Sequence, residues 1–516
     1  MNKEIEDNKV QKKETSLKAN VILNFIYQFL IIVIPLITTP YLSRVLKEEN
    51  VGINSYTLSL VELFTIFAAL GTYAYGTREI ARKKNDKATY SQLFFEIELL
   101  SVITSTISLL FWVIFSTLYV EYRFYLYILS MNIVATLFDI SWLYAGVEKF
   151  KYTIGVNALF KITGAALIFI FIHKPEHLWI YMLIHSSTIL LSNISMWIFL
   201  PKIISKPKFS SLNFKFHLKN SLKYFIPTVA VTIYTVLDKT LIGALILGYV
   251  DEEKTIKLAN VESGYYEQAT KIMTIAKSLC FISINNVMYS RASHLYEEQN
   301  IEKIKSLLNK TLNITLNLSF GAMFGLILVS SVLVPTYFGE GYDKSIYLIY
   351  ILSGVIPIIA ISNALGAIYY VPFGKRGQSA KYLIIGSVVN LVLNIPLIIF
   401  FKSIGAAIAT IIAELVITIL YVVKSDNFLN VKNLFATLWK KILSGLIMFG
   451  LLYLSKFFFE NNIGPSKLIN IIELVVLIIS GFVIYELILS LLKDNSILEF
   501  KEFLKSILGK KKNEHK

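Results

Sequence analysis

Residues 379–423 read SAKYLIIGSVVNLVLNIPLIIFFKSIGAAIATIIAELVITILYVV, which is two long apolar runs separated by Lys402. Each run, 379–401 and 403–423, is long enough to cross a hydrocarbon core of about 30 Å as a helix. Because a chain in lipid has no water to satisfy its backbone groups, runs of this kind predict transmembrane helices.

The same pattern recurs along the whole chain and predicts an all-α polytopic membrane protein. With 55% hydrophobic residues, 16% charged residues and a mean hydropathy of +0.61, the composition is too apolar for a water-soluble domain of this size. We expect 14 transmembrane helices, at 19–42, 51–75, 91–119, 124–146, 153–173, 178–200, 222–248, 259–289, 311–335, 345–370, 379–401, 403–423, 434–458 and 468–492.

Basic residues fall mainly into every second gap between these spans. Of the 50 Lys and Arg residues, 36 lie in or near one set of gaps, ten lie in or near the other, and four lie well inside the spans. This bias predicts that both termini are cytoplasmic. It also explains the net charge of +15 by topology and attraction to anionic lipid headgroups, so membrane lipids are expected partners and nucleic acid is not.

A polar interruption from Pro201 to about Asn220 separates six spans from eight. Gly52 and Arg78 bracket the second span much as Gly264 and Arg291 bracket the eighth, which suggests parallel six-helix repeats, unless the echo is a coincidence of a low-diversity sequence. The expected organisation is a cytoplasmic N-terminal arm (1–18), an N-lobe (19–200), a cytoplasmic linker (201–221), a C-lobe (222–424), two C-terminal helices (425–492) and a basic cytoplasmic tail (493–516).

Charged residues inside the spans are the candidate functional groups, because a charge in mid-membrane costs about 2.5 to 3.5 kcal/mol on insertion scales and should face a bundle interior or water. Four lysines could hold an anionic group such as phosphate, and three carboxylates could bind a coupling cation. Alternatively, Lys271 pairs with Glu267 one turn earlier, and Lys239 either extends its side chain toward the membrane interface or meets Asp238 or Asp139. The residues are Lys161, Lys239, Lys271 and Lys277, with Asp139, Asp238 and Glu414.

Tyrosines are numerous, and those near span ends are most simply interfacial anchors. Four of them could instead line a cavity and contact sugar rings: Tyr265, Tyr266, Tyr369 and Tyr370. No metalloprotease motif, phosphate-binding glycine loop or Cys/His cluster is present in the sequence, so we expect no catalytic residues, no metal and no cofactor. The chain is therefore predicted not to be an enzyme.

Several motifs resemble Wzx-type oligosaccharide flippases, the polysaccharide transporter branch of the superfamily that also contains multidrug exporters and lipid II flippases. The resemblance covers the whole length, including the fourteen spans. It is carried by PYLSRVL (40–46), YGTREIA (75–81), DISWLYAGVE (139–148), LDK (237–239) with LIG (241–243), GYY (264–266), ATKI (269–272), and Asn390 with Asn394.

The resemblance implies transport of an undecaprenyl-diphosphate-linked oligosaccharide from the cytoplasmic to the outer leaflet of a bacterial cytoplasmic (inner) membrane, for capsule or O-antigen. It also implies two six-helix lobes in a V shape, alternating access driven by a proton or sodium gradient, and a polysaccharide polymerase as partner. On this reading the four lysines and Arg44 neutralise the diphosphate. The alternatives are a lipid II flippase or multidrug exporter of the same superfamily and, from another class, a membrane polymerase or glycosyltransferase.

Overall fold

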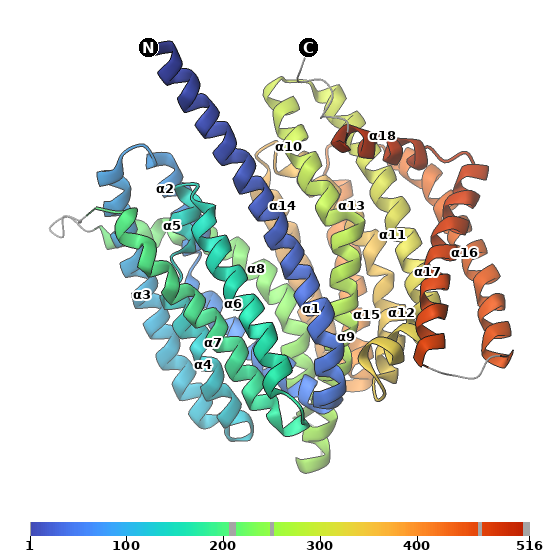
Figure 1. The fold of residues 1–516 in the computed structure, drawn as a ribbon. Coiled ribbons are helices and arrows are strands. Elements are labelled where there is room, and N and C mark those ends of the chain that lie inside the picture. The colour runs from blue at the N-terminus through green and yellow to red at the C-terminus, as the bar shows by residue number, and fades with distance from the viewer. Residues whose placement is uncertain (1, 206–212, 248–251, 463–466, 509–516) are drawn as a thin grey trace. The chain divides into compact units, whose positions relative to one another are not determined.

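The computed structural model describes residues 2–205, 213–247, 252–462 and 467–508, and Figure 1 labels its helices in chain order. Nearly all of these residues are helical and none is assigned to a strand, so the all-α prediction is confirmed. Parts of the predicted linker and of the predicted tail, 206–212 and 509–516, lie outside the described residues. The chain divides into two compact units, Met1–Thr240 and Leu241–Lys516.

The first unit contains the helices up to most of α8. They are α1 (Asn2–Ala69), α2 (Thr72–Lys83), α3 (Lys87–Leu118), η1 (Val120–Tyr122), α4 (Arg123–Leu137), α5 (Ser141–Gly146), α6 (Phe150–Phe171), η2 (Pro175–His177), α7 (Leu178–Met196), η3 (Trp197–Lys202) and α8 (Phe214–Leu247). α1 packs against α3, α4 and α6, and α7 packs against both α4 and α6. The long apolar helices therefore bury one another's sides.

α1 is interrupted at Lys47, where the backbone leaves helical geometry with φ 65° and ψ 170°. The apolar segment that includes it, Phe29–Lys83, has 55 residues, or about 80 Å at the helical rise. That length is far more than one crossing of a core of about 30 Å requires. The break at Lys47 falls between the first two predicted spans and lets the chain turn there.

Two of the motifs that carry the family resemblance meet where α2 packs against α5. A Cβ at Gly76 would lie 2.4 Å from the ring of Trp142, and a Cβ at Gly146 would lie 2.6 Å from the side chain of Ile80. Thr77 Oγ1 donates to the carbonyl of Trp142 at 3.3 Å. Residues 75–81 and 139–148 therefore specify a close helix contact, which only glycine permits at these two positions.

The second unit contains the remaining helices. They are α9 (Glu252–Lys277), the π-helical turn η5 (Ser278–Ile282), α10 (Ser283–Glu297), α11 (Ile301–Phe338), α12 (Asp343–Ser353), α13 (Val355–Leu365), the π-helical turn η6 (Gly366–Tyr370), α14 (Arg376–Phe401), α15 (Ser403–Val423), α16 (Val431–Asn462), α17 (Lys467–Leu491) and α18 (Ser496–Leu508). α11 packs against α12, α13, α16, α17 and α18. This long helix is the centre of the unit.

α14 and α15 form the hairpin encoded by residues 379–423. A Cβ at Gly405 would lie 2.0 Å from the carbonyl oxygen of Leu397, and a Cβ at Gly386 would lie 2.2 Å from Ile417. Small residues at these points allow the two backbones to approach closely, which is how helices associate where no water is displaced.

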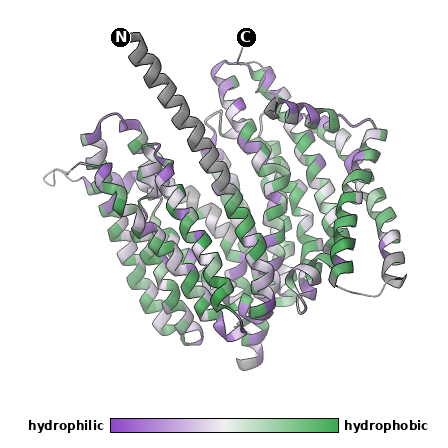
Figure 2. Ribbon diagram, viewed as in Figure 1, coloured by the Kyte–Doolittle hydropathy of each residue, from purple (hydrophilic) through white to green (hydrophobic). Residues whose placement is uncertain are grey.

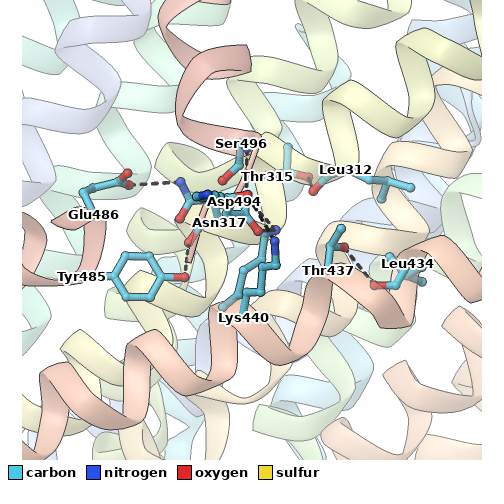
Figure 3. A network of polar contacts seen from close by, with 12 residues as sticks. Leu312, Thr315, Asn317, Leu434, Thr437, Lys440, Tyr485, Glu486, Asp494 and Ser496 are labelled. Atoms are coloured by element: carbon cyan, nitrogen blue, oxygen red, sulfur yellow. Dashed lines mark hydrogen bonds and ion pairs between the residues drawn. The ribbon is translucent and has the colours of Figure 1, made fainter. Parts of the chain in front are cut away.

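A buried polar network joins the C-terminal helices to α11 (Figure 3). The Lys441 ammonium lies 3.1 Å from Asp494 Oδ2, and both side chains are almost completely buried. Asn317 on α11 donates to Glu486 at 3.0 Å, and Tyr485 donates to the carbonyl of Asn317 at 3.1 Å. α18, which the sequence reading took as part of a basic tail, packs against α11 and α17.

Within the described residues, 11 helices are long and apolar enough to cross a membrane, or up to 12 if the bent pair α12 and α13 with η6 counts as one span. Hydrophobic residues dominate the middle of the helices in each unit, and hydrophilic residues are denser at helix ends (Figure 2). α8, predicted as the seventh span, is not among these, and Phe29–Lys83 counts once although two spans were predicted in it. The count of fourteen and the arrangement of the lobes stay predictions.

Candidate functional site

Three of the five predicted diphosphate-binding cations belong to the first unit. Arg44 lies on α1 and is half-buried, Lys161 lies on α6 and is exposed, and Lys239 lies on α8 and is half-buried. Lys161 makes no hydrogen bond or ion pair with any residue that the structure describes. A cation left in this condition on an apolar helix is available to a ligand.

Lys161 lies about 16 Å along α6 from its first residue, Phe150, at the helical rise. The neighbouring Leu159 and Ile162 are also exposed, at 62% and 51%. An ammonium group at this depth is costly against hydrocarbon, so its side chain should reach water, a headgroup or a polar cavity.

The position of Lys239 is set by a hydrogen bond one residue further on. Thr240 Oγ1 donates to Ser59 Oγ at 2.9 Å, and both groups are buried. Because Ser59 lies about 18 Å beyond the break at Lys47, this bond places Asp238 and Lys239 opposite the middle of the second half of α1. Asp238 is buried, and both residues have partners within the structure.

The other two cations, Lys271 and Lys277, lie on α9 in the second unit. Lys271 Nζ lies 3.4 Å from Glu267 Oε1, which is the pair that the alternative reading expected. Lys277 ends α9 immediately before the π-helical turn Ser278–Ile282. Such turns add one residue to a helical ladder and often occur at functional sites. The sequence pattern did not indicate this turn.

The four predicted sugar-contacting tyrosines lie in different surroundings. Tyr265 is half-buried, and Tyr266 is buried with its hydroxyl 3.3 Å from Thr410 Oγ1. The Tyr369 hydroxyl donates to Asp426 at 2.8 Å, and the fully buried Tyr370 donates to the carbonyl of Tyr421 at 2.9 Å. Tyr265 is therefore the most accessible of the four.

The three predicted coupling carboxylates divide between the units. Asp139 is half-buried in the connection between α4 and α5, and its Oδ1 accepts the backbone N–H of Ser141 at 2.9 Å. Asp238 on α8 and Glu414 on α15 are buried at 6% and 5% exposure. The structure therefore places these acids in three separate elements of two units.

Two further pairs, each between a buried acidic side chain and a basic side chain, were not predicted from the sequence. Glu262 on α9 lies 2.6 Å from Lys344 Nζ, and its other oxygen accepts the backbone N–H of Ser403 at 3.2 Å. On α3, Glu96 Oε2 lies 2.6 Å from His217 Nε2 on α8. Acids within apolar stretches were the available signal, but their partners are distant in sequence and no local pattern identifies them.

A polar pocket of about 780 Å³ lies in the second unit, and none of the predicted site residues lines it. Its wall combines five asparagines with charges of both signs. The lining residues are Glu302, Lys305, Ser306, Asn309, Lys310, Asn427, Phe428, Asn430, Asn433, Asn495, Leu498, Glu499 and Glu502. The balance of charges does not favour a diphosphate here.

Comparison with protein families and curated proteins gives consistent results. A family model described as polysaccharide biosynthesis protein matches residues 17–295. A putative O-antigen transporter of Escherichia coli (strain K12) is 26% identical over 408 residues, which cover 78% of this chain and 95% of that protein. A probable low-salt glycan biosynthesis flippase of Haloferax volcanii is 23% identical over 305 residues, which cover 59% of this chain and 60% of that protein. These relatives are named as transporters or flippases, not as enzymes.

Among solved structures, the lipid II flippase MurJ in an inward closed conformation is similar with a TM-score of 0.71. The match covers 93% of this chain and all of that one, at 16% sequence identity. At this identity the similarity shows the fold alone. It agrees with the many apolar helices of both units.

Proposed function

We propose that this chain, which belongs to the polysaccharide biosynthesis protein family, is a flippase that moves an undecaprenyl-diphosphate-linked oligosaccharide from the cytoplasmic to the outer leaflet. The observation that carries the proposal is the similarity to an O-antigen transporter over 95% of that protein's length. The membrane is the bacterial cytoplasmic membrane, and both chain termini lie in the cytoplasm, as the distribution of Lys and Arg predicts.

The substrate's diphosphate is the part that an apolar bilayer opposes most, because moving a charged group into hydrocarbon is costly. Basic side chains on both units can offset that cost: Arg44, Lys161 and Lys239 on the first, and Lys271 and Lys277 on the second. Exposed and without a partner among the described residues, Lys161 is the strongest candidate. Its ammonium pairs with a phosphate oxygen during transport.

The sugars contact tyrosines, of which Tyr265 is the first candidate because it is half-buried, whereas Tyr266, Tyr369 and Tyr370 are buried. Two lobes arranged as a V open to one side of the membrane at a time. Binding of a proton or sodium ion at Asp139, Asp238 or Glu414 drives the change between the states. A polysaccharide polymerase receives the product.

Transport is tested in a deletion strain complemented with variants. Loss of the gene should trap lipid-linked repeat units in the cytoplasmic leaflet. Lys161→Ala should lower surface polymer at least about tenfold, because removing one charge-assisted hydrogen bond costs about 1.5 to 3 kcal/mol. Lys161→Arg should restore part of it.

Lys151→Ala is the matched control, since Lys151 is also exposed on α6 but lies at its first turn, beside Tyr152. It should leave export unchanged. Normal export by Lys161→Ala, at equal protein in the membrane, would reject the phosphate role of this lysine. Repeat units that still reach the outer leaflet in the deletion strain would reject the flippase itself.

Topology is tested by cysteine labelling, because the chain has one cysteine, Cys280, which is buried and can be replaced by serine. A cysteine at Asn300 should be labelled only after the membrane is permeabilised, and one at Glu340 should be labelled in intact cells. The opposite pattern would reverse the proposed orientation.

The lipid II flippase is the second candidate, since its fold is shared over 93% of this chain. Rescue of a strain depleted of its lipid II flippase would favour that substrate. Altered drug susceptibility of the deletion strain with normal surface polymer would instead favour a multidrug exporter.

A further inference from the structure

α3 carries two acidic residues, Glu96 and Glu98, that are both buried inside an apolar helix, at 7% and 5% exposure. Glu98 lies eleven residues after the first residue of α3, Lys87, which is about 16 Å along the axis. Because a helix turns about 100° per residue, residues two apart point to nearly opposite sides. The two carboxyl groups therefore meet different surroundings.

Glu96 is fully provided with partners. Its Oε2 lies 2.6 Å from His217 Nε2, and its Oε1 accepts from Gln92 Nε2 at 3.1 Å. The other ring nitrogen of His217 lies 2.7 Å from the Tyr75 hydroxyl. This face of α3 is therefore a closed hydrogen-bond network.

Glu98 has the opposite environment. Neither of its carboxyl oxygens has a hydrogen-bond partner within the described part of the chain. The segment that contains Asp139 packs against this part of α3, because the ring of Phe94, one turn before Glu98, stacks on Trp142 with 5.5 Å between ring centroids. Asp139 lies three residues before Trp142, and its charge acts on Glu98. A buried carboxylate without a hydrogen-bond partner that also feels a second negative charge is strongly unfavourable, so the two acids must share a proton or a cation.

We propose that Glu98 and Asp139 form a proton-binding site of the first unit, in which Glu98 carries the proton in the conformation described here. The position of the proton follows from the donors. Asp139 is half-buried and accepts the backbone N–H of Ser141 at 2.9 Å, which stabilises its charged form, whereas Glu98 receives no hydrogen bond within the described residues.

A proton fits this site better than a metal ion. Hard cations require several oxygen ligands, more than two carboxyl groups alone provide. Among the described residues, no group of three or more His, Cys, Asp or Glu side chains could hold a metal ion. The charge of Asp139 also acts on the phenol of Tyr73 on α2.

The site deepens the proposed function and rests on it for its role in transport. Loss of the proton would leave the buried Glu98 charged while it feels the negative charge of Asp139, which favours a conformation where one of the two carboxylates reaches water. Uptake and release of a proton at Glu98 would then couple to the change between the two transport states.

The test is modification of the purified full-length protein by dicyclohexylcarbodiimide, which reacts with protonated carboxyl groups in apolar surroundings, followed by peptide mass spectrometry. Glu98 should be modified, most at low pH and progressively less as the pH rises. Glu96, two residues away on the same helix, is the internal control and should remain unmodified. Asp139→Asn should reduce modification of Glu98 at pH 8, since the neighbouring charge no longer favours the protonated form.

No modification of Glu98 at any pH in folded protein would overturn the proposal, as would equal modification of Glu96. Protection by sodium chloride, but not by choline chloride, would also overturn it in favour of a sodium site. Export is measured separately: Glu98→Gln should lose surface polymer at equal membrane level, and full export would remove the coupling role. If the chain were not a flippase, Glu98 would still be modified while the deletion strain trapped no lipid-linked glycan.

Discussion

Replacing Lys441 by methionine should destabilise the second unit far more than the same change at the adjacent Lys440. Lys441 is 0% exposed and lies 3.1 Å from Asp494, which is 2% exposed. At an effective dielectric constant of about 20, two charges at this distance attract by about 5 kcal/mol before desolvation is counted. Lys440 is only half-buried, and its ammonium donates to the carbonyl of Lys493 at 3.2 Å.

Removing one partner of a buried pair typically costs about 3 to 5 kcal/mol, because the other charge is left buried and uncompensated. We expect Lys441→Met to lower the free energy of unfolding by that amount, which is about two to three and a half powers of ten in the folding equilibrium. Lys440→Met should change it by less than about 0.5 kcal/mol. Combining Lys441→Met with Asp494→Asn should recover most of the loss, since no unpaired charge remains.

The assay is equilibrium unfolding of the detergent-solubilised protein by increasing sodium dodecyl sulfate, followed by circular dichroism. Equal effects of the two lysine substitutions would refute the reasoning, as would a double variant no more stable than Lys441→Met.

The Lys441–Asp494 pair also predicts that stability depends on pH. Burial alone would raise the pKa of the Asp494 carboxyl, but the Lys441 ammonium and the N–H of Ser496 outweigh it and hold this pKa below its usual value. The stabilisation by the ionised Asp494 carboxyl is therefore present above about pH 4, near the pKa of this group in the unfolded chain. It is lost as the pH falls through the lowered pKa of Asp494 in the folded protein.

Three further predictions concern the second unit. Gly405→Ala should greatly reduce the yield of monodisperse protein in size-exclusion chromatography, because its Cβ would lie 2.0 Å from the carbonyl oxygen of Leu397. Gly377→Ala is the control and should not reduce the yield, because its Cβ would meet no atom within 4 Å. Equal yields of the two variants would contradict the packing argument. Glu262→Gln should lower the free energy of unfolding by about 2 kcal/mol, because it weakens the buried bonds to Lys344 and Ser403. Glu302→Gln is the control, since the side chain of Glu302 is 86% exposed, and it should have no measurable effect in the same titration. Hydrogen bonds from Lys375 and Tyr369 hold the pKa of the Asp426 carboxyl below its usual value. The contribution of this carboxylate to stability therefore exists above about pH 4 and disappears as the pH falls through the lowered pKa. A difference in melting temperature between wild type and Asp426→Asn that persisted at pH 2 would contradict this origin.

The fold class could be predicted because the bilayer imposes one requirement on every segment that crosses it. Long apolar runs must form helices to satisfy their own backbone groups, and no tertiary information is needed to see this. Element boundaries were less accessible. The π-helical turn Ser278–Ile282 had no signal in the local composition. Likewise, Ser496–Leu508 is a helix packed against α11, although its sequence resembles a basic tail.

The candidate site shows the same division. Lysines within apolar helices could be identified from the sequence, because each is costly there and requires a reason. Whether a given lysine has an ion-pair partner could not be predicted from the sequence. Lys271 has a partner one turn away, and Lys161 has none among the described residues, yet both look alike in a hydropathy profile.

The sequence by itself determined that this is a helical membrane protein, which way its basic loops should point, and which charges need an explanation, because hydropathy and charge are properties of each residue alone. Only the tertiary structure decided what those charges meet. Glu96 and Glu98 are the same residue type two positions apart, but Glu96 bonds to His217 and Gln92, whereas Glu98 has no hydrogen-bond partner among the described residues and feels the charge of Asp139. Their partners come from helices distant in sequence, so the chemistry of each carboxyl group is set by packing rather than by its neighbours along the chain.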